Sequence, residues 1–150
     1  MGLALNFIRQ SLAPGVYLVG VPIGTARDIT LRALDVLASA DILAAEDTRS
    51  LRKLMEIHGV PLGNRRIVAL HDHSTENVQN RLLEQVSSGK SVAYASEAGM
   101  PLIADPGFEL VRAAAKAQLP VTTAPGPSSV PTALAPVSYT HLTLPTILLV

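Results

Sequence analysis

Short apolar runs alternate with amphipathic runs five times along the 150 residues of this chain. The apolar runs occupy residues 15–21, 41–46, 66–70, 91–95 and 120–124. In the runs that follow them, apolar residues recur every three or four positions, which is the spacing of one helical face. Because the short runs are apolar throughout, they are typical of strands buried on both faces. The alternation predicts an α/β domain with a mostly parallel five-stranded sheet flanked by helices.

The same spacing assigns each helix an inward face. We expect helices over residues 28–40, 47–59, 75–88 and 107–118, with a fifth after residue 128. The residues expected to face the core are Leu31, Ala33, Leu34, Leu37, Ala38, Leu51, Leu54, Met55, His58, Val78, Leu82, Val86, Phe108, Val111, Ala114, Ala115 and Leu119. Asp28 or Thr30 is a suitable N-cap for the first helix. Gly59 and Gly89 are suitable residues for helix ends.

The loops differ according to the sheet edge on which they lie. Those after strands read "PIGTARD", "EDTR", "HDHSTEN", "SEAGMPLIADPG" and "PGPSS", and they hold nearly all the glycines, prolines, acids and histidines. Loops after helices, such as "SSGK", are ordinary connectors. In parallel sheets, ligands bind beyond the carboxyl ends of the strands. The sequence therefore predicts one functional edge.

The loop over residues 96–107 is the most unusual of these, because strand-to-helix loops usually need two to six residues. Its glycines allow backbone groups to approach a ligand closely. Its prolines restrict the backbone, so the loop has its shape before a ligand binds. That composition suits a small, flat, mainly neutral ligand, such as adenosine with a short amino-acid tail.

Several kinds of site are excluded or disfavoured by the residues present. The chain has no cysteine, which excludes disulfides, thiol nucleophiles and thiolate metal sites. No glycine-rich phosphate cradle is present, and Ser96 lies in no nucleophile-elbow pattern. On an extended segment only His71 and His73 of "HDH" share a face, so we predict no metal site.

Charge and hydropathy give weaker indications. The formal net charge is zero, which does not favour a strongly electrostatic partner. A local patch of Arg49, Arg52, Lys53, Arg65 and Arg66 could hold RNA or could be a solvated surface. No apolar run is long enough to span a membrane, and the start of the chain is a poor signal peptide. We expect a cytoplasmic protein without a membrane partner.

Four ordered motifs resemble a known family. They are "VGVPIGTARDITLRALDVLASADILAAEDTR", "ALHDHSTEN", "SEAGMPLIADPG" and "APGPSS". Together they resemble the N-terminal domain of the 16S ribosomal RNA (cytidine-2′-O)-methyltransferases of the tetrapyrrole methylase superfamily. The resemblance covers residues 15–135. We expect residues 1–14 to be a short extension with a frayed end. Residues 136–150 do not resemble the family and are expected to be a foreign or frame-shifted tail.

The resemblance implies an enzyme that uses S-adenosyl-L-methionine, bound in a cleft between two α/β domains, and that is usually a homodimer. Its substrate would be a cytidine ribose of 16S rRNA in the small ribosomal subunit. The residues that it places near the cofactor are Pro22, Gly24, Gly99, Met100, Pro101, Ile103, Pro125, Gly126, Pro127 and Ser128. A base must take the proton of the ribose hydroxyl. The candidates are His71, His73, Glu46, Asp47 and Glu97, although helix capping is the favoured role of Asp47.

Three residues depart from the family pattern: Glu97 replaces an aspartate, Met100 a threonine and Thr25 an asparagine. Met100 removes a hydroxyl, so we expect the side-chain hydrogen bond there to be lost. The family's second domain is expected to be absent from this sequence, which would leave half of the cofactor cleft missing. Two alternatives therefore remain: a methyltransferase acting on tetrapyrroles or diphthamide precursors, and a folded fragment without activity.

Overall fold

The computed structural model describes residues 7–71, 76–101 and 107–137. In chain order its elements are β1 (Gly15–Val19), η1 (Ala26–Asp28), α1 (Leu31–Ser39), β2 (Ile42–Ala45), α2 (Thr48–Ile57), β3 (Ile67–Ala69), α3 (Glu76–Ser87), β4 (Ser91–Ala95), α4 (Gly107–Lys116), β5 (Val121–Ala124), α5 (Ser129–Leu134) and η2 (Ala135–Val137). The strands form one sheet in the order β3-β2-β4-β1-β5, and every neighbouring pair is parallel. The predicted α/β class and the parallel five-stranded sheet are confirmed.

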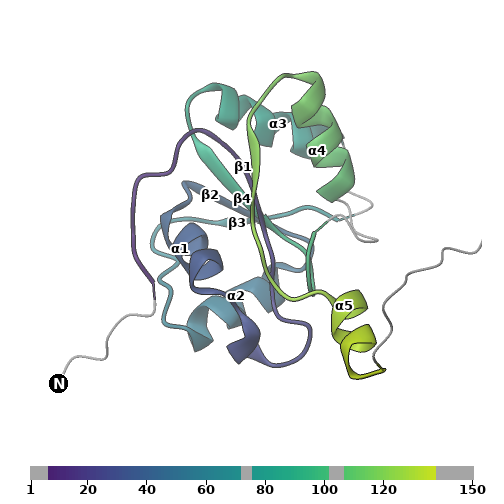
Figure 1. Ribbon diagram of the computed structural model, residues 1–150. Helices are drawn as coiled ribbons and strands as arrows, with labels where there is room; N and C mark the ends of the chain where they lie inside the picture. Colours follow the sequence, from purple (N-terminus) through teal and green to yellow (C-terminus); the bar gives the residue numbers. More distant parts are fainter. Residues whose placement is uncertain (1–6, 72–75, 102–106, 138–150) are drawn as a thin grey trace, which may run out of the picture.

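Helices cover both faces of the sheet: α1 and α2 lie on one face, and α3 and α4 lie on the other (Figure 1). Each face has its own apolar core, one containing Leu37 and Met55 and the other Leu82 and Leu110. Strand β4 is buried at every position. The edge strands β3 and β5 are partly exposed, because each has only one neighbouring strand. Burial on both faces therefore holds for the central strands and not for the edges.

The segment before β1 packs against α1, and the expected frayed end is wrong for residues 7–14. Phe7 is buried in the core. The backbone N–H of Ile8 donates to Asp35 Oδ1 at 2.6 Å, and the backbone N–H of Gln10 donates to Ser39 Oγ at 3.1 Å. These contacts join the segment to a helix that follows it by nearly thirty residues. Residues 7–14 therefore belong to the folded body.

Three of the residues expected to face the core are exposed. Leu31 is 66% exposed and Phe108 is 56% exposed, and Ala115 is exposed as well. In α4 the inward residues are Leu110 and Ala114, and the residue after an inward one lies about 100° further around a helix. The spacing was correct, but the face assigned to α4 was too broad.

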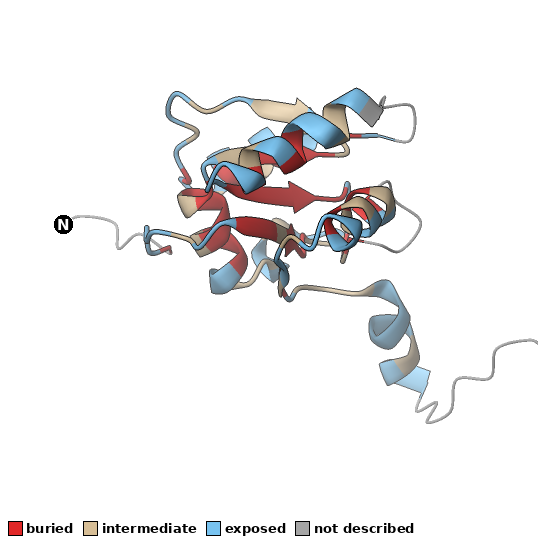
Figure 2. Ribbon diagram, turned by 90° about the horizontal axis from the view of Figure 1, so that it is seen from above, coloured by how far each residue is buried: buried red, intermediate tan, exposed pale blue. Residues whose placement is uncertain are grey.

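The helix ends follow local chemistry. Thr30 Oγ1 accepts the N–H of Ala33 at 3.1 Å, so Thr30 is the cap of α1 and Asp28 is not. Gly59 and Gly89 have positive φ angles of 66° and 94° just after α2 and α3, as expected of helix ends. Helix α5 has no buried residue and extends away from the body (Figure 2). The sheet edge that carries the site is therefore supported by the four helices that pack on the sheet, α1 to α4.

Candidate functional site

The loops after β1 and β5 touch through their backbones at the carboxyl edge of the sheet. A Cβ atom added to Gly20 would lie 2.6 Å from the Cα and N atoms of Gly126. A Cβ added to Gly126 would in turn lie 2.8 Å from Gly20 Cα. Real Cβ atoms do not approach other atoms so closely. Both positions therefore need glycine, and the two loops form a junction that no side chain separates.

The loop after β4 joins the same junction through a pair of backbone hydrogen bonds. Val21 N–H donates to Gly99 O at 2.9 Å, and Gly99 N–H donates to Val21 O at 3.1 Å. Gly99 has a φ angle of 73°, a conformation that favours glycine. The buried Ser96 hydroxyl donates to Gly99 O at 3.4 Å from within the same loop. Three of the loops predicted to form the functional edge are thus brought together.

Met100 fills the space beside the glycine junction. Its sulfur accepts a hydrogen bond from the N–H of Gly126 at 3.1 Å. A Cβ on Gly20 would lie only 2.7 Å from the same sulfur. The expectation that Met100 makes no side-chain hydrogen bond is therefore wrong, because a thioether is still a weak acceptor. Met100 connects the loops after β4 and β5.

The loop after β5 is also held from α1. Thr30 Oγ1 donates to Pro125 O at 2.9 Å while it caps α1. One hydroxyl therefore fixes both the start of the helix and the position of the loop. Sequence reasoning recognised the cap but missed the second contact, because the two residues are far apart in the chain. It missed Gly20 for the same reason.

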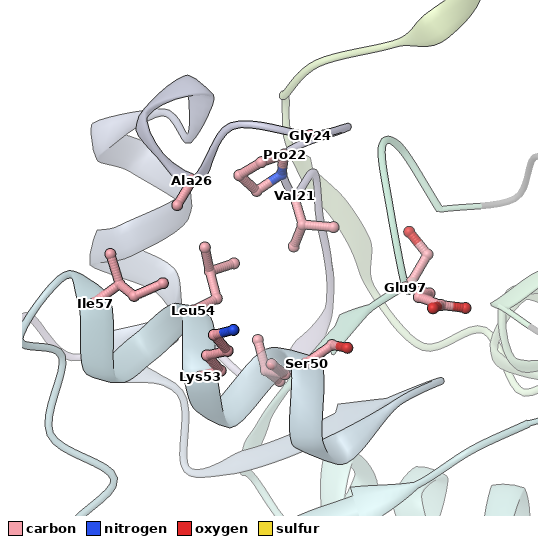
Figure 3. Close-up of a pocket in the computed structure, with 11 residues that line it drawn as sticks. Val21, Pro22, Gly24, Ala26, Ser50, Lys53, Leu54, Ile57 and Glu97 are labelled. Atoms are coloured by element: carbon pink, nitrogen blue, oxygen red, sulfur yellow. The ribbon is translucent and has the colours of Figure 1, made fainter.

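A pocket of about 180 Å³ opens beside the junction, between the loop after β1 and helix α2 (Figure 3). Pro22, Gly24 and Ala26 border it on one side, and Leu54 and Ile57 border it on the other (Figure 3). Polar groups at its rim come from Ser50, Lys53, Ser96 and Glu97. Pockets for drug-sized ligands usually exceed 300 Å³. The pocket is therefore large enough for one ring system and too small for a whole cofactor.

The three carboxylates proposed as bases have different surroundings. Asp47 Oδ1 accepts the N–H of Arg49 at 2.8 Å and caps α2. This backbone hydrogen bond holds the pKa of Asp47 below its usual value. Glu46 Oε2 accepts the N–H of Glu97 at 2.9 Å and so holds the loop after β4. The side chain of Glu97 is exposed and borders the pocket.

The two described histidines have different neighbours. His71 is exposed and follows the edge strand β3, which pairs directly with β2, the strand before Glu46 and Asp47. Strand β2 separates β3 from β4, the strand before Glu97. His73 lies outside the described residues. His58 was assigned only a packing role, but its Nε2 lies 2.8 Å from Ala26 O and joins the end of α2 to η1. Among the described residues, no group of three or more His, Asp or Glu side chains is arranged to hold a metal ion.

The residues expected near the cofactor come from three loops. Pro22 and Gly24 follow β1, Gly99, Met100 and Pro101 follow β4, and Pro125, Gly126, Pro127 and Ser128 follow β5. Ile103 lies outside the described residues. Within residues 20–26, 96–101 and 125–128 there is no lysine or arginine. These loops therefore offer neutral backbone groups and the carboxylate of Glu97.

The predicted basic patch divides into two kinds of residue. Arg65 donates to the carbonyl oxygens of Leu37 and Ala40, both at 2.8 Å, and to those of Pro61 and Leu62. Burial lowers the pKa of Arg65. This guanidinium therefore closes the end of α1 and is not part of an open surface. The other four cations of the patch are exposed.

Comparisons with known proteins show which family the chain resembles. Residues 15–144 match the family described as tetrapyrrole (corrin/porphyrin) methylases. The chain is 46% identical over 120 residues to the ribosomal RNA small subunit methyltransferase I of Mesorhizobium japonicum, covering 80% of this chain and 40% of that protein. It is 44% identical to the protein of the same name from Escherichia coli O157:H7, covering 79% and 41%. The chain thus spans about two fifths of the length of these relatives.

Solved structures show the same fold. A uroporphyrin-III-C-methyltransferase from Thermus thermophilus matches with a TM-score of 0.60 and 27% identity, covering 81% of this chain and 53% of that one. A diphthine synthase matches with a TM-score of 0.62 and 21% identity, covering 80% and 47%. Over the part of the chain that the structure describes, no helix has both the length and the hydropathy to cross a membrane.

Proposed function

The chain belongs to the family of tetrapyrrole (corrin/porphyrin) methylases, and from this we propose that it carries the catalytic edge of a methyltransferase acting on small-subunit ribosomal RNA. The methyl donor would be S-adenosyl-L-methionine. The observation that carries the proposal is the glycine junction of Gly20 and Gly126, braced by Gly99 and Met100. It presents backbone groups of three loops at the edge where parallel sheets bind ligands.

The residues present fit this cofactor. The backbone N–H groups of Gly24, Met100 and Ser128 have no hydrogen-bond partner among the described residues. A donor set of neutral amides without lysine or arginine suits a nucleoside that bears no phosphate. Glu97 and Glu46 place negative charge nearby, which favours a positively charged sulfonium. We propose that the loops after β1, β4 and β5 hold the cofactor on this side.

When bound, the cofactor supplies a methyl group on a sulfonium, which is already a good leaving group. The chain's own contribution is to align the accepting oxygen and to remove its proton. Glu97 is the candidate base best supported by position, because its side chain borders the pocket and its backbone is held by Glu46. Asp47 and Glu46 act as positioning residues, since their carboxylates already accept backbone N–H groups.

The finer features of the reaction are part of the same proposal. We propose a cytidine 2′-hydroxyl of 16S rRNA as the acceptor and a homodimer as the assembly of the longer protein. The 46% identity to an rRNA methyltransferase supports an RNA acceptor. A tetrapyrrole acceptor is the second candidate, supported by the 27% identity to a uroporphyrin-III-C-methyltransferase.

Calorimetric titration of the chain with S-adenosylhomocysteine tests the cofactor site. We expect micromolar binding, and we expect Gly99→Ala to weaken it at least about tenfold, which is about 1.4 kcal/mol. The matched control is Gly89→Ala. Both glycines have a positive φ, so both variants carry a similar backbone strain, but Gly89 lies at the other end of the sheet.

Two results would contradict the proposal. One is the absence of binding heat from a chain shown to be folded by circular dichroism. The other is equal weakening by the two variants, which would place the ligand away from the loop after β4.

A further inference from the structure

Helix α2 carries three cations on its exposed side: Arg49, Arg52 and Lys53. These residues are called here the α2 cationic face. Arg49 precedes Arg52 by three positions and Lys53 by four, so it is a neighbour of both on the helix surface. Like charges at this spacing repel one another and disfavour the helix. One exposed carboxylate, that of Glu56, follows Arg52 by four positions and Lys53 by three.

The α2 cationic face is poorly neutralised. Arg49 Nε lies 3.8 Å from Asp47 Oδ1, and that oxygen already caps the helix. Neither Arg52 nor Lys53 forms an ion pair with any carboxylate in the described part of the chain. Although the net charge of the chain is zero, helix α2 has more exposed cations than carboxylates on its side of the pocket, where Glu97 contributes a negative charge from the opposite loop.

One hollow borders this face, and a second hollow shares the residue Ile57 with the first. The first is the 180 Å³ pocket, to which Lys53 contributes. The second has a volume of about 360 Å³ and is lined by Arg27 and Leu31 among others. Ile57 lines both hollows and is 56% exposed, and Leu31 is 66% exposed. Each hollow therefore combines exposed apolar side chains with a cation.

We propose that this surface binds a single-stranded segment of RNA, with its phosphates on the α2 cationic face and two successive bases in the two hollows. Charge complementarity carries the choice of occupant, because phosphates are the group that neutralises a row of unpaired arginine and lysine side chains. Single-stranded RNA can turn its unstacked bases onto a protein surface. The inference rests on the proposed function, since the first hollow also borders Glu97.

The first hollow lies between the loops proposed to hold the cofactor, which contribute Pro22, Gly24 and Glu97, and helix α2, which contributes Lys53. Residues 20–26, 96–101 and 125–128 contain no lysine or arginine, whereas Lys53 lines the first hollow and Arg27, which follows directly in the loop after β1, lines the second. The acceptor strand would therefore approach from the side of α2. The first hollow would receive the base of the nucleotide nearest to the methyl donor.

Fluorescence anisotropy of a short labelled single-stranded RNA, titrated with the chain at several salt concentrations, tests the inference. The double variant Arg52→Ala/Lys53→Ala should weaken binding at least about tenfold at low salt and reduce the slope of log K against log salt by about 1–2. The matched control, Arg81→Ala/Lys116→Ala, removes the same charge from exposed positions on α3 and α4 and should change neither quantity.

A third variant, Ile57→Ser, tests the hollows themselves. Because Ile57 is largely exposed, the fold should persist. RNA binding should weaken while the salt slope stays unchanged, since no phosphate contact is lost.

Three results would overturn the inference: equal loss in the α2 and control double variants, no RNA binding by a chain that binds S-adenosylhomocysteine, or equal competition by polyglutamate. Each of them leaves the proposed function standing. Conversely, RNA binding that depends on α2 in a chain that fails to bind S-adenosylhomocysteine would support the surface and contradict the cofactor site.

Discussion

At the scale of single residues, the site depends on two glycines whose lack of a side chain leaves room for a backbone contact. Gly20 and Gly126 have no side chains, and this absence is what allows two loops to meet. Met100 then fills the remaining space and accepts the N–H of Gly126. The junction is therefore held by close packing, by the weak hydrogen bond to Met100 and by the backbone hydrogen bonds between Val21 and Gly99. Small changes in side-chain volume there should therefore destabilise it.

Replacing Gly20 with alanine tests this packing. The new methyl group would lie 2.6 Å from Gly126 backbone atoms, so the loops must separate. We expect a loss of about 1–3 kcal/mol in the free energy of unfolding, measured by urea denaturation. Gly24→Ala is the control, because no atom lies within 4 Å of its added Cβ, and it should stay within about 0.5 kcal/mol of the parent. Equal stability of the two variants would contradict the described contact.

The residues of the site were only partly predictable from the sequence. Pro22, Gly24 and Gly99 stand out because glycine and proline after a strand have a local meaning. Gly20 does not stand out, since its partner Gly126 is more than a hundred residues away and only the fold brings the two together. The role of Arg65 was not predicted for a similar reason: two of its four carbonyl acceptors, those of Leu37 and Ala40, lie at the end of α1, and charge patterning does not encode that contact.

At the scale of elements, strands β2 and β4 are joined at their amino ends by one side chain. Asp41 Oδ2 accepts the N–H of Ser91 at 2.8 Å and the Ser91 hydroxyl at 2.7 Å. The backbone hydrogen bond from Ser91 holds the pKa of Asp41 below its ordinary value of 3.8. The ionised carboxylate is therefore the form that the folded chain stabilises.

This contact should make part of the stability depend on pH. A lowered folded pKa means that the contribution is complete above the unfolded value of 3.8 and is lost as the pH falls through the folded value. We expect Asp41→Asn to lose about 1 kcal/mol at pH 7, measured by urea unfolding, and the difference from the parent to vanish in stronger acid. Asp28→Asn is the control, because the Asp28 carboxylate accepts no hydrogen bond from the described residues. A pH-independent difference would contradict the assigned cause.

The elements themselves were well predicted, because each depends on a local pattern. The order of five strands and five helices followed from runs of apolar residues, and the ends of α2 and α3 followed from Gly59 and Gly89. The inward face of α4 was harder to predict. Phe108 is large and apolar, so periodicity alone placed it in the core. In the structure the side chains of α4 that are buried in the core are those of Leu110 and Ala114.

At the scale of the whole molecule, the two ends of the described chain contribute unequally to the buried core. Residues 7–14 add Phe7 to the core, whereas α5 and η2 have no buried residue. The domain boundaries that we propose, residues 15–135 with a preceding extension, therefore do not coincide with the limits of the stable body.

Shortening the chain from each end tests this difference. Ending it at Ser128 should change the free energy of unfolding by less than about 1 kcal/mol, because α5 and η2, the described elements that are removed, contain no buried residue. Removing residues 1–10 should cost about 2–4 kcal/mol, because it takes Phe7 out of the core and leaves a cavity. Urea denaturation of both shortened chains measures the two changes. A larger loss from the C-terminal deletion would show that α5 supports the sheet.

The strand order also has a consequence for synthesis on the ribosome. Strand β1 pairs only with β4 and β5, yet it leaves the exit tunnel first. At translation rates of about 5–20 residues per second, it must wait several seconds for its first partner, with apolar residues on both sides and no neighbour to pair with. During this interval the nascent chain exposes an aggregation-prone segment. Slower elongation through α3 should therefore increase the need for a chaperone that shields the emerging chain.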